Sequence, residues 1–151
     1  MEIEIHEDPI HFRLLGVGGV VENEQYGPTG MGLMDKMWRL VKEGKVPNTG
    51  INHWVYLPDR KMFVGVEPRP HAQQPITAEL EPLEFSLPRY LKHVHIGPYQ
   101  ALPQKWRDLK AELARQGEEM SGPALEVYGH HCDDPAKLET TIVIGLARKG
   151  G

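Results

Sequence analysis

Short runs of apolar residues, separated by turns and by two stretches of helical spacing, organise the whole chain. In the first half, residues 12–21 are apolar and interrupted by glycine, which is typical of a strand. A loop is expected at 22–32, and the spacing of apolar residues over 33–43 predicts a helix. Two further strands are expected at 51–57 and 62–67, joined by a turn of Pro, Asp, Arg and Lys.

The second half repeats this order. Residues 89–96 have the pattern of a strand, and residues 102–116 that of a helix with one apolar face. The next two strands are expected at 125–129 and 141–146. In the strand around Glu126, apolar residues alternate with Glu126 and Tyr128, which therefore share one face.

The two halves align at one offset of 72 residues. This offset relates positions of the helices and of the strands: Met34 to Trp106, Met37 to Leu109, Val41 to Leu113, Trp54 to Glu126 and Tyr56 to Tyr128. Agreement across a helix and a strand predicts an internal duplication, although periodic patterns also align by chance.

We therefore predict one domain over 1–151, with repeat 1 at about 10–68, a linker at 69–87 and repeat 2 at about 88–148. Residues 79–85 of the linker have the pattern of an edge strand. Two strand-helix-strand-strand units give an α+β fold, with an antiparallel sheet and two helices around a central pocket. Equivalent faces of the duplicated strands are expected to line that pocket, at the interface of the halves.

Composition favours a soluble protein and argues against several partners. The 151 residues are 40% hydrophobic and 25% charged, with a net charge of −4, so no basic surface indicates nucleic acid or an anionic membrane. One cysteine excludes a disulfide framework within the chain. The acidic, alternating start is unlike a signal peptide, and no apolar run has the length of a membrane span. We expect a cytoplasmic location.

Aromatic residues and one acid form the candidate ligand site. The proposed ligand-binding residues are Tyr26, Trp38, Trp54, Tyr56, Tyr99, Trp106, Glu126 and Tyr128, with Met31 and Met34 as adaptable filler. Aromatic rings stack on planar ligands and attract cations through their π-faces, and a carboxylate among them favours a cationic ligand. The alternative is structural: Trp38 and Trp106 at helical spacing are also typical of a core, and Glu126 of a solvent-facing position.

The second half resembles the GyrI-like small-molecule-binding domain, which occurs in gyrase-inhibitor proteins and in the effector-binding domains of multidrug-responsive activators. The resemblance rests on an ordered series of residues: His95-Ile96-Gly97-Pro98-Tyr99, Leu102, Trp106, Leu109, Gly117, Gly122-Pro123, Glu126-Val127-Tyr128, Asp134-Pro135 and Thr140-Thr141-Ile142. The first half, with Trp38 and Asn52-His53-Trp54-Val55-Tyr56, looks like the stand-alone branch.

The resemblance implies a duplicated fold and an aromatic pocket with a buried glutamate, at Glu126, beside a tyrosine, at Tyr128. It implies flat, apolar and often cationic ligands such as dyes and drugs. Relatives often carry an acid and an aromatic in the last strand, whereas this chain has no aromatic over 140–144. Glu139 is the candidate for a second pocket charge.

Three functions are compatible with these residues. The first is binding of planar, hydrophobic, cationic small molecules, by sequestration or sensing. The second is hydrolysis, because stand-alone relatives open the cyclopropane of DNA-alkylating toxins, and Glu126 or Tyr128 could act as the acid. The third is a protein-interaction role, as in gyrase inhibitors. Whether the chain is an enzyme stays open at this point.

Cofactor signals are weak. His93 and His95 share a strand face, but no third metal ligand is evident nearby. The run His130-His131-Cys132-Asp133-Asp134 is better interpreted as a polar turn than as a metal site, and a haem role for His93 or His131 rests on fold analogy alone. The glycines at 16–19 do not match a dinucleotide-binding loop. We expect no metal and no cofactor.

Overall fold

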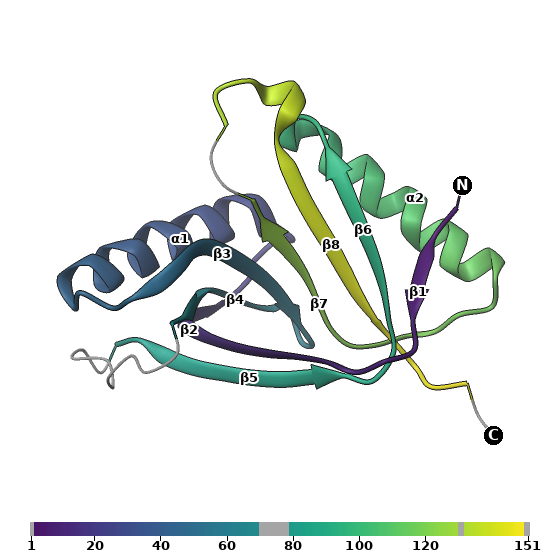
Figure 1. Cartoon of the computed structure of the whole chain (residues 1–151), viewed down its shortest axis with the longest axis horizontal. Coiled ribbons are helices and arrows are strands. Elements are labelled where there is room, and N and C mark those ends of the chain that lie inside the picture. The colour runs from purple at the N-terminus through teal and green to yellow at the C-terminus, as the bar shows by residue number, and fades with distance from the viewer. Residues whose placement is uncertain (1, 70–78, 130–131, 150–151) are drawn as a thin grey trace. The chain divides into compact units, whose positions relative to one another are not determined.

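The computed structural model describes residues 2–69, 79–129 and 132–149, which form an α+β fold (Figure 1). The chain divides into two compact units, which we call the terminal unit (Met1–Ile10 and Leu87–Gly151) and the central unit (His11–Ser86). In chain order the elements are β1 (Glu4–His6), β2 (Ile10–Val20), α1 (Tyr26–Glu43), β3 (Asn48–Leu57), β4 (Lys61–Pro68), β5 (Glu81–Leu87), β6 (Tyr90–Ile96), the 3-10 helix η1 (Tyr99–Ala101), α2 (Leu102–Arg115), β7 (Met120–Tyr128), the 3-10 helix η2 (Pro135–Lys137) and β8 (Glu139–Leu146).

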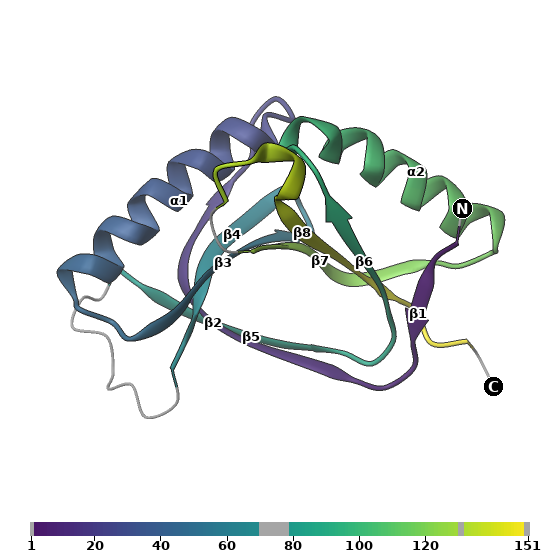
Figure 2. The ribbon, with the colours of Figure 1, turned by 45° about the horizontal axis from the view of Figure 1, so that its top comes forward.

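In the central unit the strands lie in the order β3-β4-β2-β5, and α1 lies along one face of them (Figure 2). Strand β4 pairs antiparallel with both β3 and β2. Val64 of β4 lies opposite Trp54 and Val17 and is fully buried, so this strand carries the centre of the unit's core. Strand β5 corresponds to the edge strand expected at 79–85.

Helix α1 is longer than the sequence pattern predicts. The loop expected at 22–32 is wrong over most of its length, because the helix begins at Tyr26. Pro28 falls in the first turn, where the backbone N–H that proline lacks would have no helical partner. A Cβ atom on Gly30 would lie 2.2 Å from Cζ3 of Trp54, so this glycine is required by close packing against β3 and does not mark a loop.

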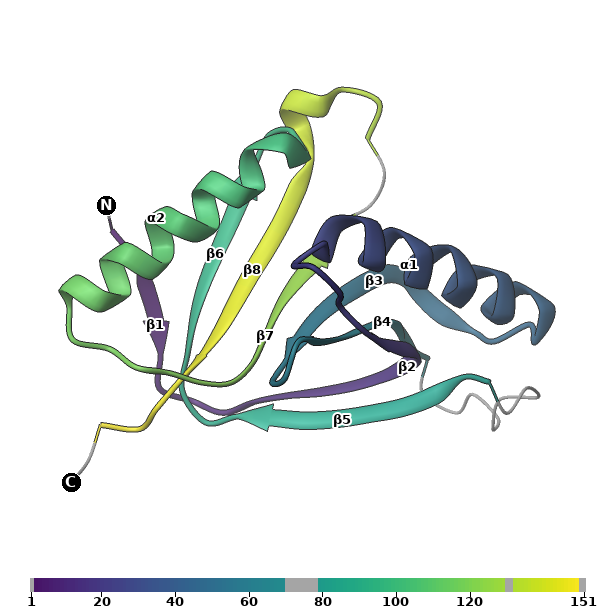
Figure 3. The same ribbon diagram turned by 180° about the vertical axis from the view of Figure 1, so that it is seen from behind.

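In the terminal unit the strands lie in the order β1-β6-β8-β7, and α2 lies along β6 and β8 (Figure 3). The apolar face of α2 belongs to a core cluster that joins the helix to β6 and β8 and contains Leu91, Leu102, Leu109, Leu113, Ile142, Ile144 and Leu146. Leu109 and Leu113 are 0% and 2% exposed, and each fully buried leucine contributes about 1.5–3 kcal/mol. The helix predicted at 102–116 is confirmed, and Gly117, with φ of +74°, follows its end.

The two units share one topology, which confirms the tandem strand-helix-strand-strand pattern. Strands β2, β3 and β4 pair in the same order as β6, β7 and β8, with α1 and α2 in equivalent places. The second strand of each set has a register shift, between Asn48 and Asn52 in β3 and between Met120 and Ala124 in β7. Gly50 (φ +82°) and Gly122 (φ +77°) lie in these shifts, so the offset of 72 residues also relates the two β-bulges.

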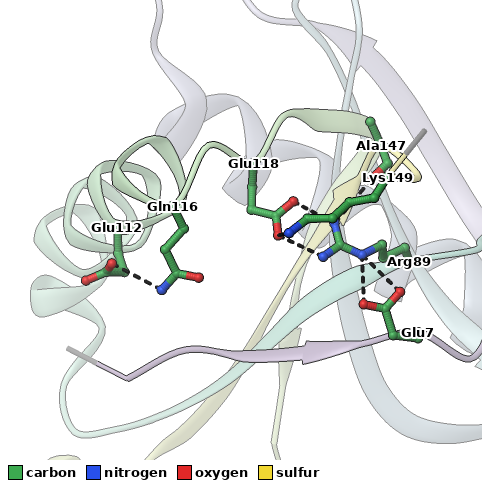
Figure 4. A network of polar contacts seen from close by, with 7 residues as sticks. All are labelled: Glu7, Arg89, Glu112, Gln116, Glu118, Ala147 and Lys149. Atoms are coloured by element: carbon green, nitrogen blue, oxygen red, sulfur yellow. Dashed lines mark hydrogen bonds and ion pairs between the residues drawn. The ribbon is translucent and has the colours of Figure 1, made fainter. Parts of the chain in front are cut away.

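One buried cation fastens four segments of the terminal unit (Figure 4). Arg89, just before β6, is 5% exposed. Its Nε lies 3.0 Å from both carboxylate oxygens of Glu7, and its Nη1 and Nη2 donate to Glu118 at 2.6 and 2.7 Å. Its Nη1 also donates to the carbonyl of Ala147 after β8, at 3.3 Å. These hydrogen bonds lower the pKa of Glu118 below its ordinary value of 4.5.

Across the residues that the structure describes, neither α1 nor α2 combines the length and the apolar character that a membrane-crossing helix needs.

Alanine substitutions at Gly32 and Gly50 test the effect of backbone conformation on stability without a change in packing contacts. An added Cβ at Gly32 or at Gly50 meets no atom within 4 Å, but Gly50 has φ of +82° whereas Gly32 lies within α1. We expect Gly32→Ala to raise the free energy of unfolding by about 1 kcal/mol. We expect Gly50→Ala to lower it by about 1 kcal/mol, because an L-residue is strained there. Urea unfolding measures both, and a neutral or stabilising Gly50→Ala would contradict the bulge argument.

The Arg89 pair predicts a pH-dependent stability. We expect Glu118→Gln to lower the free energy of unfolding at pH 7 by roughly 2–4 kcal/mol, because it leaves a buried guanidinium partly uncompensated. Since the folded-state pKa of Glu118 is lowered, its contribution is present above pH 4.5 and is lost as the pH falls through the native value. The gap between wild type and variant therefore narrows in acid. The exposed Glu119→Gln is the control, and a gap independent of pH from 7 to 3 would refute this role.

Candidate functional site

Glu126 lies on the face of β7 that points toward α2. It is 4% exposed, and it lies opposite Ile142 of β8, which belongs to the core cluster beneath α2. Because residues of neighbouring strands that lie opposite each other share a face, the carboxylate points into the unit. The alternative of a solvent-facing Glu126 is therefore wrong.

Each oxygen of the Glu126 carboxylate accepts a hydrogen bond from an aromatic side chain. The indole Nε1 of Trp106 in α2 donates to Oε2 at 2.8 Å, and the hydroxyl of Tyr128 donates to Oε1 at 2.9 Å. A buried carboxylate without such donors would cost several kcal/mol, at the order of magnitude expected for charged groups. These bonds bring together three of the predicted site residues from a helix and a strand.

Tyr128 acts as a donor that keeps its proton. Burial, the charge of Glu126 and the hydrogen bond to it raise the pKa of Tyr128 well above its ordinary value of 10. Its ring meets that of Tyr99 edge-on, with 5.4 Å between centroids. Tyr99, in η1, is 41% exposed, so it forms the outer member of the group.

Trp106 is both a core residue and a site residue. It is half-buried and packs against the leucine and isoleucine cluster of the terminal unit while its indole holds Glu126. The ammonium of Lys110 lies 5.7 Å from the centre of its ring, within the range of a cation–π contact. The packing interpretation of this tryptophan is therefore confirmed, whereas its contact with a ligand stays a prediction.

The remaining predicted site residues lie in the central unit. Tyr26 at the start of α1 meets Tyr56 of β3 edge-on, with 5.8 Å between ring centroids. Trp54 is 7% exposed and packs on Gly30 of α1. The last three lie on α1: Trp38 and Met34 half-buried, and Met31 50% exposed. A pocket shared by the two repeats stays a prediction.

Three polar residues on the Glu126 face, His93, His95 and Thr140, were not predicted as neighbours of the site. The sequence pattern placed the two histidines as weak metal candidates. In the β6–β8–β7 register, His95 lies opposite Thr140, and Thr140 lies opposite Tyr128. The next row places His93 beside Ile142, which lies opposite Glu126. Burial, Lys105 and His95 lower the pKa of His93, which favours its neutral form. Strand register was the missing signal, because it sets which residues of three strands become neighbours.

Other candidate groups are placed away from this face or lie outside the described residues. Glu139 precedes Thr140 on β8 and is exposed, so its side chain projects from the opposite face to Glu126. His130 and His131 fall outside the described residues, and Cys132 is a half-buried free thiol. Within 2–69, 79–129 and 132–149, no three His, Cys, Asp or Glu residues lie close enough to hold a metal.

Comparison with known proteins gives structural matches alone. No protein-family model matches the chain, and no curated protein matches its sequence. The structure of SAV2435 bound to tetraphenylphosphonium matches with a TM-score of 0.68 and 15% identity, over 97% of this chain and 94% of that one. The EcmrR C-terminal domain matches with 0.71 and 13%, over 99% and 100%. A hydrolase from Listeria innocua matches with 0.54 and 12%, over 93% and 92%.

These matches establish the fold. The chain has the fold of the GyrI-like small-molecule-binding domains, as the sequence predicts. Sequence identities of 12–15% support a shared fold and nothing finer. The roles of Glu126 and its neighbours therefore depend on their own geometry in this structure.

The Tyr128 phenol predicts a loss of stability in alkali. Its raised pKa means that the folded state keeps the proton after the unfolded chain has lost it, so stability present below pH 10 falls as the pH rises above that value. We expect Tyr128→Phe to flatten this fall between pH 9 and 11.5. Urea unfolding across that range measures it, and identical pH profiles for wild type and variant would refute the assignment.

Proposed function

We propose that this chain binds aromatic, apolar, cationic organic molecules, and that Glu126 is the residue that attracts the charge. The observation that carries the proposal is a carboxylate 4% exposed, held between an indole and a phenol. Both donors are neutral groups, so these two hydrogen bonds position the carboxylate without cancelling its charge. A desolvated negative charge next to aromatic rings attracts a cation more strongly than it would in water.

The fold supports the same function. SAV2435, of the same fold, is described as bound to tetraphenylphosphonium, an aromatic cation. We extend small-molecule binding from that protein to this one because the acid and the rings lie on one face of the terminal unit. The ring contacts predicted for Tyr26, Trp38, Trp54 and Tyr56 of the central unit stay predictions of the sequence. In this role the protein would sequester or sense drugs, dyes and other xenobiotics.

The state of Tyr128 argues against this phenol as the acid in hydrolysis of cyclopropane-bearing toxins, and leaves Glu126 as the candidate acid of that alternative. A phenol whose pKa is raised above 10 keeps its proton and therefore serves as a hydrogen-bond donor more readily than as a general acid near neutral pH. A fold match to a Listeria innocua hydrolase at 12% identity does not carry an activity to this chain. The gyrase-interaction alternative stays a prediction of the sequence resemblance.

The charge argument is tested by titrating tryptophan fluorescence with tetraphenylphosphonium and with triphenylphosphine oxide, a neutral relative. We expect Glu126→Gln to weaken the cation at least tenfold, about 1.4 kcal/mol, and to change the affinity for the neutral compound less than threefold. The reason is that the variant keeps the shape of the site and removes its charge.

Glu112→Gln is the matched control, because Glu112 is also a buried carboxylate of the terminal unit, at 9% exposed, and is bonded to Arg115 and Gln116. It should leave both affinities unchanged, with folding of each variant checked by circular dichroism. Equal losses for the two compounds in Glu126→Gln, or no binding of the cation by wild type, would overturn the proposal.

A further inference from the structure

The hydroxyl of Thr140 is one polar group, among the described residues of the terminal unit, that the proposed site leaves unexplained. Thr140 is 0% exposed, and its Oγ1 has no hydrogen-bond partner within the structure described. A buried hydroxyl without a partner costs free energy on folding, and buried side-chain polar atoms are rarely left so. The presence of this hydroxyl in the buried part of β8 therefore requires a physical reason.

Its position ties it to the candidate site. Thr140 lies opposite Tyr128 in the β7–β8 pairing and opposite His95 in the β6–β8 pairing, so it stands between these two residues on the face that α2 covers. Side chains that lie opposite one another on antiparallel strands have Cβ atoms about 5 Å apart. The hydroxyl is thus one strand away from the phenol that donates to Glu126.

One polar group of each neighbour already has a partner elsewhere. Tyr128 donates its hydroxyl to Glu126, and a ring nitrogen of His95 lies 3.3 Å from the carbonyl oxygen of Pro98. Thr140 is β-branched, which suits a strand, and valine would fill the same space without the cost of a buried hydroxyl. The strand thus carries an oxygen that its packing does not require.

From this arrangement we propose that Thr140 is a specificity residue: its hydroxyl hydrogen-bonds a polar substituent, such as a hydroxyl or a carbonyl oxygen, on the aromatic cation that Glu126 attracts. This inference rests on the proposed function and adds a second recognition element to it. A site built around a hydrogen-bonding group discriminates against an analogue that cannot make the bond, since the group is then left unpaired. Because Thr140 is 0% exposed, the proposal includes movement of the side chains that cover it when a ligand binds.

The test uses two probes of equal charge and similar shape, tetraphenylphosphonium and its monohydroxylated derivatives, (3-hydroxyphenyl)- and (4-hydroxyphenyl)triphenylphosphonium. We expect wild type to bind one hydroxylated probe roughly tenfold more tightly than the parent cation, at the order of magnitude of one well-placed hydrogen bond. Thr140→Val should abolish this preference and leave the affinity for the parent cation unchanged. Thr140→Ser, which keeps the hydroxyl, should retain it.

Thermal unfolding without ligand is the second measurement. Because valine removes an unpartnered polar atom, we expect Thr140→Val to raise Tm by about 3 °C. Thr141→Val, on the opposite face of β8, is the control for replacing a threonine of this strand and should leave the ligand preference intact. A lower Tm in Thr140→Val would mean that the hydroxyl is partnered in solution, and would overturn the inference.

The outcomes distinguish this inference from the function on which it rests. If neither cation binds wild type, the proposed function fails. If the cations bind and Glu126→Gln weakens both, but the hydroxylated probes show no preference that depends on Thr140, cation binding stands and the specificity role is refuted.

Discussion

A charge taken out of water must be hydrogen-bonded, and this requirement sets the arrangement of the terminal unit around Glu126. Its two donors come from different elements, Trp106 of α2 and Tyr128 of β7. The carboxylate therefore ties the helix to the strand, in addition to the leucine contacts of α2. A rotation of α2 that kept its apolar face buried but moved the indole would leave Glu126 short of a donor, so the acid fixes the helix more narrowly than apolar packing alone.

Much of the fold could be predicted because the spacing of hydrophobic residues indicates most of its helices and strands. The helix at 102–115 and the paired strands at 51–57 and 62–67 follow directly from periodicity, and one offset identified the repeat. The first turns of α1 could not be predicted, because glycine and proline indicate a loop unless the ring packed on Gly30 is known. The bulges also escaped prediction, since a register shift depends on the partner strand.

The candidate site was partly predictable for a different reason. The two-residue period of a strand is enough to predict that Glu126 and Tyr128 share a face. The family resemblance added the prediction that this face lines a ligand pocket. The hydrogen bond from Trp106 required the position of α2, and the row of His95 and Thr140 beside Tyr128 required the register of three strands. Residues that meet across strands are distant in sequence, so no local sequence pattern predicts their contact.

The glycine of each bulge also sets which face of the strand the following residues occupy. Glu126 lies four positions after Gly122, and Trp54 lies four positions after Gly50. Because successive strand residues alternate between faces, one inserted or deleted residue in that interval would turn the acid of one repeat, or the indole of the other, to the opposite side of its strand. A substitution at Glu126 or Trp54 thus keeps the face of the strand, whereas a change of length between the glycine and that position does not.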